Sequence, residues 1–196
     1  MRRICVFCGS SPGAREVYAE SARAFGRALA ERGHELIYGG GSRGLMGILA
    51  DAALASGARV IGVLPRGLFE REVPLRGLTE LHEVASMHER KARMADLADA
   101  FVALPGGYGT YDELFEIITW AQIGLHNKPI ALLDVDDYFS PLVSMVERAV
   151  AEGFVPGPFA ALVRRTSDPH GLLDYLEHLP LTPPPVPSSA LERPER

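Results

Sequence analysis

The sequence predicts an α/β fold, a doubly wound, Rossmann-like parallel sheet with helices on both of its faces. Short apolar segments that suit strands alternate with longer amphipathic segments that suit helices along most of the chain. The strand segments are apolar throughout, as in parallel strands that are covered on both faces. Glycine-rich turns follow three of these strands, where such sheets commonly bind ligands.

The predicted elements follow one another in regular order. Strands are expected at residues 3–8, 35–38, 59–64, 81–85, 100–104, 130–134 and 162–165. Helices are expected at residues 15–32, 45–56, 87–97, 111–123, 141–151 and 169–178. The strand ranges are short and apolar, whereas the helix ranges repeat apolar residues at helical spacing.

Composition sets the class of protein. The 196 residues are 47% apolar, enough for the core of one domain at residues 1–179. Residues 180–196 are rich in proline and lack periodicity, so we expect a disordered tail there. The net charge of -5 argues against a nucleic-acid partner. No apolar run has the length of a membrane span, and the N-terminus leads straight into a strand, so we expect a cytoplasmic protein without a membrane partner.

The two cysteines, Cys5 and Cys8, have the C-x-x-C spacing of redox and zinc motifs. Positions three apart on a strand point to opposite faces, so the two thiols cannot readily meet. The sequence has no second cysteine pair and no H-E-x-x-H motif to complete a zinc site. We interpret both cysteines as core residues and predict no metal site.

Glycine-rich turns lie at residues 9–13, 39–44 and 106–109. In a parallel sheet these turns meet at the carboxyl edge of the strands. Glycine lets backbone N–H groups approach an anion, and the start of the following helix adds partial positive charge. Any one turn could serve only for close packing, but three at one edge indicate a phosphate-bearing ligand.

The middle turn also fits two other motifs. Residues 39–44 match the dinucleotide fingerprint G-x-G-x-x-G, but the next strand lacks the acidic residue that would hold a ribose. Residues 40–44 read G-x-S-x-G, with Ser42 as a nucleophile and Asp137 and His170 in the chain order of a hydrolase triad. Because His170 sits in an ordinary helix-start signal, the triad is the weaker interpretation.

The third turn leads into P-G-G-Y-G-T-Y-D-E at residues 105–113. Thr110 and Glu113 have the spacing of a capping box, in which each side chain bonds the other's backbone N–H. Glu113 also shares a helical stripe with Ile117 and Trp120, so it should face inward. A carboxylate in that position, beside a glycine turn, is well placed for catalysis.

Arg90 is predicted to be buried. It lies on the helical stripe of Met87, Met94 and Leu97, which is the apolar side of its helix. A buried guanidinium without an anionic partner is very costly, so a partner is expected. Glu113 or a ligand phosphate would serve.

Taken together, these motifs resemble the LONELY GUY (LOG) family. The matching segments are V-F-C-G-S-S at 6–11, Y-G-G-G-S at 38–42, M-H-E-R-K at 87–91, residues 105–113, T-W-A-Q at 119–122 and N-K-P at 127–129. The resemblance covers residues 3–165. Members of that family are cytokinin riboside 5′-monophosphate phosphoribohydrolases, which release an N6-substituted adenine and ribose 5-phosphate, need no cofactor or metal, and form homodimers.

The resemblance implies roles for individual residues. Arg90 and Glu113 match the catalytic pair. The positions that match substrate-binding residues are Glu72, Lys91, Gly107, Tyr108, Gly109, Thr110, Tyr111, Asp112 and Thr119. The first two glycine turns add Gly9, Ser10, Gly40, Gly41 and Ser42 as candidate substrate-binding residues. A carboxylate can stabilise an oxocarbenium-like centre, while a cation offsets charge on the leaving base.

A homodimer would also explain the helix at 111–123, which is apolar around most of its circumference. Such a helix must be buried on both sides, and the resemblance supplies a second subunit related by two-fold symmetry.

Other functions remain open at this point. A general AMP nucleosidase would use the same residues, and a nonenzymatic nucleotide or cofactor carrier would need the phosphate turns but not the pair. Relatives of this fold were often labelled lysine decarboxylases, which need pyridoxal phosphate on a Schiff-base lysine. Only Lys91 and Lys128 could supply it, and both match other positions of the family. We therefore expect no cofactor.

Overall fold

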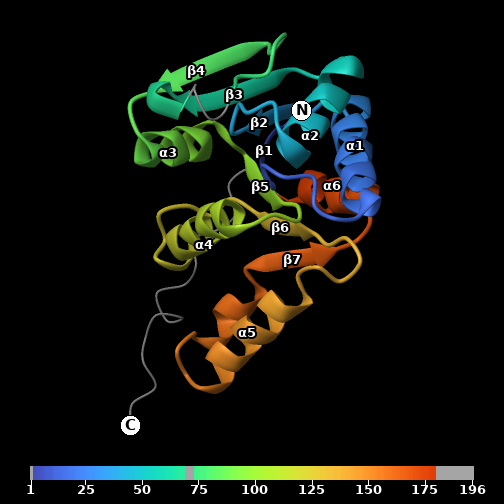
Figure 1. Cartoon of the computed structure of the whole chain (residues 1–196). Coiled ribbons are helices and arrows are strands. Elements are labelled where there is room, and N and C mark those ends of the chain that lie inside the picture. Colours follow the sequence, from blue (N-terminus) through green and yellow to red (C-terminus); the bar gives the residue numbers. More distant parts are fainter. Residues whose placement is uncertain (1, 69–72, 180–196) are drawn as a thin grey trace.

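The structure, a computed structural model, describes residues 2–68 and 73–179 (Figure 1). The strands are β1 (Arg3–Phe7), β2 (Glu35–Tyr38), β3 (Val60–Pro65), β4 (Glu80–Val84), β5 (Ala100–Ala103), β6 (Ile130–Leu133) and β7 (Val163–Thr166). The helices are α1 (Glu16–Glu31), α2 (Gly44–Ala55), α3 (Met87–Leu97), α4 (Tyr108–Gln122), α5 (Ser140–Ala151) and α6 (Pro169–His178). Short 3-10 helices lie at Arg66–Leu68 and Gly157–Ala161.

Helices cover both faces of the parallel sheet (Figure 1). On one face α1, α2 and α6 bury an apolar core that includes Phe25, Leu49 and Leu173. On the other face α3 and α4 bury a second core, which includes Met94 and Leu114. This is the doubly wound, Rossmann-like fold class that the sequence predicts, and that prediction is confirmed.

The strand order places a ligand site near the middle of the sheet. In the order β4-β3-β2-β1-β5-β6-β7, the chain builds outward from β1 to β4 and then returns to build outward again from β5. The connections therefore diverge between β1 and β5, which opens a crevice at the carboxyl ends of these two strands. Phe7 is in register with Ala103 there, and just beyond them Gly9 N–H donates to Pro105 O over 3.1 Å.

The two cysteines are buried, and both are free thiols. Cys5 belongs to the core under α3 and α4, whereas Cys8 belongs to the core under α1 and α2. The interpretation of both as core residues on opposite faces is confirmed. Burial raises the pKa of each thiol, so neither is poised as a thiolate.

Two sequence predictions fall on residues that the structure does not describe. Glu72 lies in the gap between residues 68 and 73, and the proline-rich segment 180–196 follows the last described residue. Within residues 2–68 and 73–179, no helix is long and apolar enough to cross a membrane.

Candidate active site

A cavity of about 160 Å³ opens at the crevice between β1 and β5. The first and third glycine turns, α2, α3 and α4 contribute its walls. The sequence-predicted site residues that line it are Gly9, Ser10, Arg90, Gly107, Tyr108, Gly109, Thr110, Asp112 and Glu113. The structure therefore brings the predicted catalytic pair and the third turn together with the first turn.

Three further lining residues were missed as site residues: Cys8, Met46 and Met87. Met46 lies at the start of α2, just after the second glycine-rich segment, and this position was the signal that could have identified it. Met87 was interpreted as part of an apolar stripe and of the M-H-E-R-K segment, without a role at the site. Both thioethers give the cavity an adaptable apolar surface beside its charged pair.

Helix α4 begins earlier than the sequence predicts. Its N-cap is Gly107, which has no side chain to accept a hydrogen bond, and its first residue is Tyr108. Thr110 and Glu113 thus lie inside the helix, and the predicted capping box is wrong. Thr110 is instead buried against Gly106, where an added Cβ would lie 2.1 Å from Thr110 Oγ1.

Arg90 and Glu113 form a buried ion pair at the cavity. Arg90 Nη1 lies 3.3 Å from Glu113 Oε1, and the two side chains are 6% and 11% exposed. This contact confirms the prediction that the buried guanidinium has an anionic partner. Arg90 also donates from Nε to Val63 O over 3.1 Å and from Nη2 to Gly39 O over 3.2 Å.

The middle glycine turn makes room for this guanidinium. A Cβ on Gly39 would lie 1.8 Å from Arg90 Nη2. Gly44, at φ +59°, passes so close to the first turn that an added Cβ would lie 2.3 Å from the carbonyl carbon of Ser10. The middle turn thus supports the cavity by close packing of backbone.

The other residues proposed in this turn lie outside the cavity wall. Gly41 forms an isolated antiparallel bridge with Pro74, and Ser42 N–H donates to Val73 O over 3.0 Å. Gly40 has φ +80° and packs on Val63 and Leu64. The contribution of Gly40, Gly41 and Ser42 to substrate binding stays a prediction.

Lys91 joins α3 to α4 beside the catalytic pair. Its Nζ lies 3.1 Å from Asp112 Oδ2 and 3.1 Å from Glu116 Oε1. Burial alone would lower the pKa of Lys91, but the hydrogen bonds to these two carboxylates outweigh it and raise the pKa. Lys91 is therefore a charged cross-link, and its side chain is outside the cavity lining.

Two more predicted residues of α4 lie away from the cavity. Thr119 is exposed, and its Oγ1 donates to Phe115 O over 2.7 Å. Tyr111 OH lies 2.7 Å from Tyr138 OH.

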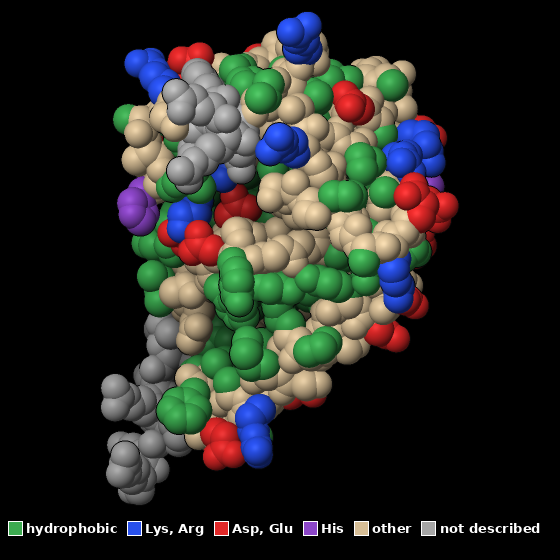
Figure 2. All heavy atoms as spheres, viewed as in Figure 1, with side chains coloured by type: hydrophobic (Ala, Val, Ile, Leu, Met, Phe, Trp, Pro, Cys, Tyr) green, Lys and Arg blue, Asp and Glu red, His purple; other side chains and the backbone are tan. Residues whose placement is uncertain are grey.

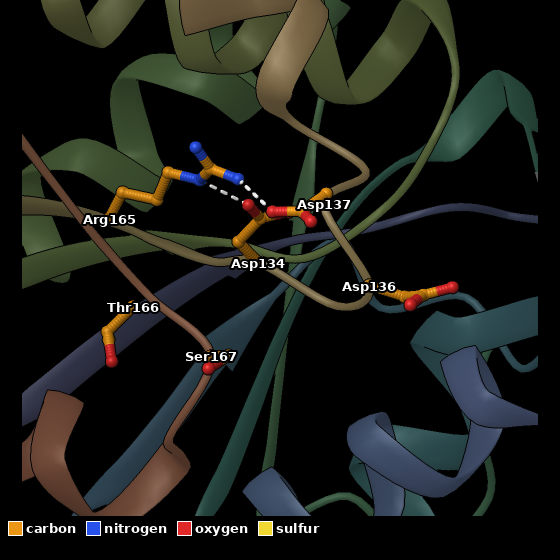
Figure 3. A pocket seen from close by; sticks show the side chains of 6 residues that line it. All are labelled: Asp134, Asp136, Asp137, Arg165, Thr166 and Ser167. Atoms are coloured by element: carbon orange, nitrogen blue, oxygen red, sulfur yellow. Dashed lines mark hydrogen bonds and ion pairs between the residues drawn. The ribbon is translucent and has the colours of Figure 1, made fainter.

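The serine-hydrolase triad is wrong. Ser42 follows β2 and His170 begins α6 after β7, and four strand spacings of about 4.8 Å separate these strands. Asp137 Oδ1 instead binds Arg165 Nη2 over 2.6 Å (Figure 3). His170 N–H donates to the N-cap Asp168, which confirms the helix-start interpretation.

Asp137 and Arg165 belong to a second, larger pocket of about 460 Å³ (Figure 3). Each of its three carboxylates has a cationic partner, because Arg165 binds the buried Asp134 as well as Asp137, and Arg15 binds Asp136. Across the part of the chain that the structure describes, no group of three His, Cys, Asp or Glu residues is placed to hold a metal ion. The smaller cavity with the Arg90–Glu113 pair is the candidate active site.

Comparison with known proteins places this site in a family. A family model described as "possible lysine decarboxylase" matches residues 46–176. The chain is 48% identical over 191 residues to the probable cytokinin riboside 5′-monophosphate phosphoribohydrolase LOGL5 of Oryza sativa subsp. japonica, covering 97% of this chain and 77% of that protein. It is 53% identical over 154 residues to the cytokinin riboside 5′-monophosphate phosphoribohydrolase LOG7 of Arabidopsis thaliana, covering 79% and 71%. The chain belongs to the LOG family.

Solved structures of more distant proteins share the fold of this LOG family member. The X-ray structure of TM1055 matches with a TM-score of 0.72 at 20% identity, covering 91% of this chain and 100% of that chain. The molybdenum cofactor binding protein from Rippkaea orientalis matches with a TM-score of 0.68 at 20% identity, covering 90% and 96%. At these identities the likeness concerns the fold alone.

The contact between Gly39 and Arg90 leads to a stability prediction. Gly39→Ala should lower the free energy of unfolding by about 1–3 kcal/mol, because the new methyl group displaces the guanidinium. Gly157→Ala is the control, since an added Cβ there meets nothing within 4 Å. Urea unfolding measures both.

A double-mutant cycle assigns that cost to Arg90. Gly39→Ala should cost less in an Arg90→Met background, because methionine lacks the hydrogen bonds that hold the guanidinium against Gly39 and can move away from the methyl group. Equal costs in both backgrounds would show that the guanidinium is not what Gly39 accommodates.

Proposed function

We propose that this chain hydrolyses the N-glycosidic bond of N6-substituted adenosine 5′-monophosphates and releases a free cytokinin base and ribose 5-phosphate. The observation that carries the proposal is the buried Arg90–Glu113 pair in the crevice cavity of a LOG family chain. Relatives that are about half identical in sequence are named for this reaction.

Each member of the pair has a role in bond cleavage. As the ribosyl C–N bond breaks, positive charge develops on the sugar, and the Glu113 carboxylate stabilises it or holds the ribose hydroxyls and attacking water. Electron density passes to the leaving base, where the guanidinium of Arg90 offsets it. Arg90 is fixed by two backbone carbonyls, so the pair is positioned before the substrate arrives.

The phosphate is assigned to the first and third glycine turns. Gly9, Ser10 and Gly107 line the cavity, and the N–H groups of the first turn of α4 have no carbonyl one turn earlier to bond. A helix start with free N–H groups favours an anion. Phosphate bound there would orient the ribose toward Glu113.

Decarboxylation of lysine fits the chain poorly. Pyridoxal phosphate would need a free amine for its Schiff base. Lys91 holds Asp112 and Glu116, and Lys128 Nζ donates to Ala95 O over 2.7 Å. Neither amine lines the cavity. A carrier function shares the fold but gives no reason for the buried pair, which therefore favours the enzyme.

We also propose that the chain forms a homodimer through α4 and α5. Helix α5 contains Leu142, Val143 and Met145, yet none of its residues is buried. Figure 2 shows hydrophobic side chains gathered over the lower half of the molecule, where Figure 1 places these helices. The segments that follow α4 and α5 carry large exposed apolar residues, Leu125 at 68% and Phe154 at 83%. A patch of this kind marks an interface.

The cytoplasmic location stays a prediction.

The dimer can be tested by light scattering. At micromolar concentration the mass should be twice the 21.2 kDa of one chain. Replacing Phe154 and Met145 together with Asp should give monomers, whereas Val73→Asp, at a residue 54% exposed in the loop before β4, should not. A wild-type monomer would contradict this assignment.

The catalytic role of Glu113 predicts a large loss on Glu113→Gln. Base release from isopentenyladenosine monophosphate should fall by at least about 100-fold, because the neutral amide cannot stabilise the developing positive charge. Chromatography of the free base measures it. Glu152→Gln, in a surface ion pair with Arg148 at the end of α5, should retain activity. A thermal melt of each variant is needed, because Glu113→Gln leaves a buried guanidinium without an anion. Near-normal turnover by a folded Glu113→Gln would contradict the role.

The phosphate should be required for turnover. Each charge-assisted contact contributes about 1.5–3 kcal/mol, so loss of two or three should lower kcat/KM by on the order of a thousandfold or more. Part of the loss should appear in kcat, because the phosphate positions the sugar from a distance. Isopentenyladenosine is compared with its 5′-monophosphate, and adenosine with AMP. Similar kcat/KM within a pair would indicate a plain nucleosidase.

A further inference from the structure

Two tyrosine hydroxyls hold the backbone of the third glycine turn from behind. Tyr138 OH donates to Gly106 O, and Tyr111 OH lies 2.7 Å from Tyr138 OH. A carbonyl oxygen can only accept, so the single hydroxyl hydrogen of Tyr138 is used at Gly106. The bond between the tyrosines therefore has Tyr111 as its donor. The hydrogen bonds run in one direction, from Tyr111 to Tyr138 to Gly106.

The ring of Tyr138 is itself fixed. It lies edge-on to Tyr18, with ring centroids 5.8 Å apart, and edge-on to Phe139, with centroids 5.2 Å apart. Burial and the hydrogen bond to Tyr138 raise the pKa of Tyr111 to about 12. Tyr111 therefore keeps its proton at neutral pH and can act as the donor.

The bonded turn separates two cavities. Tyr138 and Gly106 line a cavity of about 200 Å³, and Gly9, Ser10 and Gly107 line both this cavity and the candidate active site. Tyr138 thus contacts the turn from the side opposite Arg90 and Glu113, and its hydroxyl is absent from the wall of the candidate active site.

Peptide geometry links the hydrogen bond at the Gly106 carbonyl to the direction of the Gly107 N–H. The described part of the chain has no cis peptide bonds, so the Gly106 carbonyl and the Gly107 N–H point in opposite directions from one planar unit. A carbonyl held by Tyr138 therefore directs the Gly107 N–H away from Tyr138. Gly107 has no side chain, and an added Cβ would meet nothing within 4 Å, so packing at Gly107 does not hold this peptide.

We propose that Tyr138 is a positioning residue that keeps the Gly107 N–H directed at the substrate's phosphate, and that Tyr111 acts through Tyr138 without touching substrate. The inference rests on the proposed function for the identity of the anion. It gives Tyr111 a role different from the direct substrate binding that its place in the motif implies.

Tyr138→Phe tests the hydroxyl while retaining the ring. By calorimetry, the Kd for ribose 5-phosphate should rise about two- to tenfold, the range of one neutral hydrogen bond. Inhibition by the free base adenine should stay unchanged, because it carries no phosphate. With nucleotide substrate KM should rise, and kcat should fall by a smaller factor, because part of the binding energy of the phosphate positions the sugar. Tyr175→Phe, on α6 beside Arg164, is the matched control and should leave the Kd for ribose 5-phosphate, the KM and the kcat unchanged.

A double-mutant cycle tests the direction of the hydrogen bonds. Tyr111→Phe alone should weaken ribose 5-phosphate binding less than Tyr138→Phe does, because the bond to Gly106 remains. In the Tyr138→Phe background, Tyr111→Phe should add no further loss. An equal loss in both backgrounds would mean that Tyr111 contacts substrate itself and would overturn the inference.

The outcomes separate the inference from the proposed function. If the wild type binds ribose 5-phosphate but releases no base, the proposed function fails, and the effect of Tyr138→Phe on Kd still decides the inference. If the wild type releases base and Tyr138→Phe binds ribose 5-phosphate as tightly as the wild type, the inference fails alone. A general loss of stability by Tyr138→Phe would weaken adenine inhibition as well, which would contradict a positioning role.

Discussion

The buried guanidinium of Arg90 is the interaction on which the candidate site depends. It binds one carbonyl just after β2, one within β3 and the carboxylate of Glu113, so it joins α3, the sheet and α4. Burying a charge is costly unless its hydrogen-bonding groups are satisfied. The groups that bind this guanidinium come from segments far apart in sequence. The site can therefore form only when the sheet has assembled. Gly39 belongs to the same constraint, because any larger residue would occupy the space of the guanidinium.

Because of this constraint, the three glycine turns have different roles. From sequence they look equivalent, since each follows a strand and precedes a helix. In the structure the first and third turns flank the cavity, while the middle turn lets backbone and guanidinium pack closely. Phosphate binding would then draw on two turns and the start of α4, and the middle turn would act through Arg90. Lys91, with its two carboxylates, ties α3 to α4 a second time beside the buried pair.

Patterns within short stretches of the sequence predicted the features that depend on neighbouring residues of the chain. Apolar periodicity placed the strands and helices to within a few residues, and the stripe through Met87 and Met94 predicted that Arg90 is buried. The start of α4 was missed because Thr110 and Glu113 fit a capping box, while the close approach of Thr110 to Gly106 is a tertiary contact. The bond from Tyr138 to Gly106 spans 32 residues and leaves no local pattern. Helix α5 looked like an ordinary amphipathic helix, and only the folded chain shows that none of its residues is buried.

The fold alone does not decide between an enzyme and a carrier. A molybdenum cofactor binding protein and a Moco carrier protein share it at 20% and 21% sequence identity, with TM-scores of 0.68 and 0.67. An open parallel sheet with glycine turns at its switch point provides an anion site whatever happens to the bound molecule. Chemistry needs a further element, a charge held where charge develops in the transition state. A buried carboxylate fixed by a guanidinium is costly in a protein that only binds, and it has a clear use where a glycosidic bond breaks. The assignment as a hydrolase therefore rests on the pair, because an anion site at the edge of the sheet would serve a binding protein as well as an enzyme.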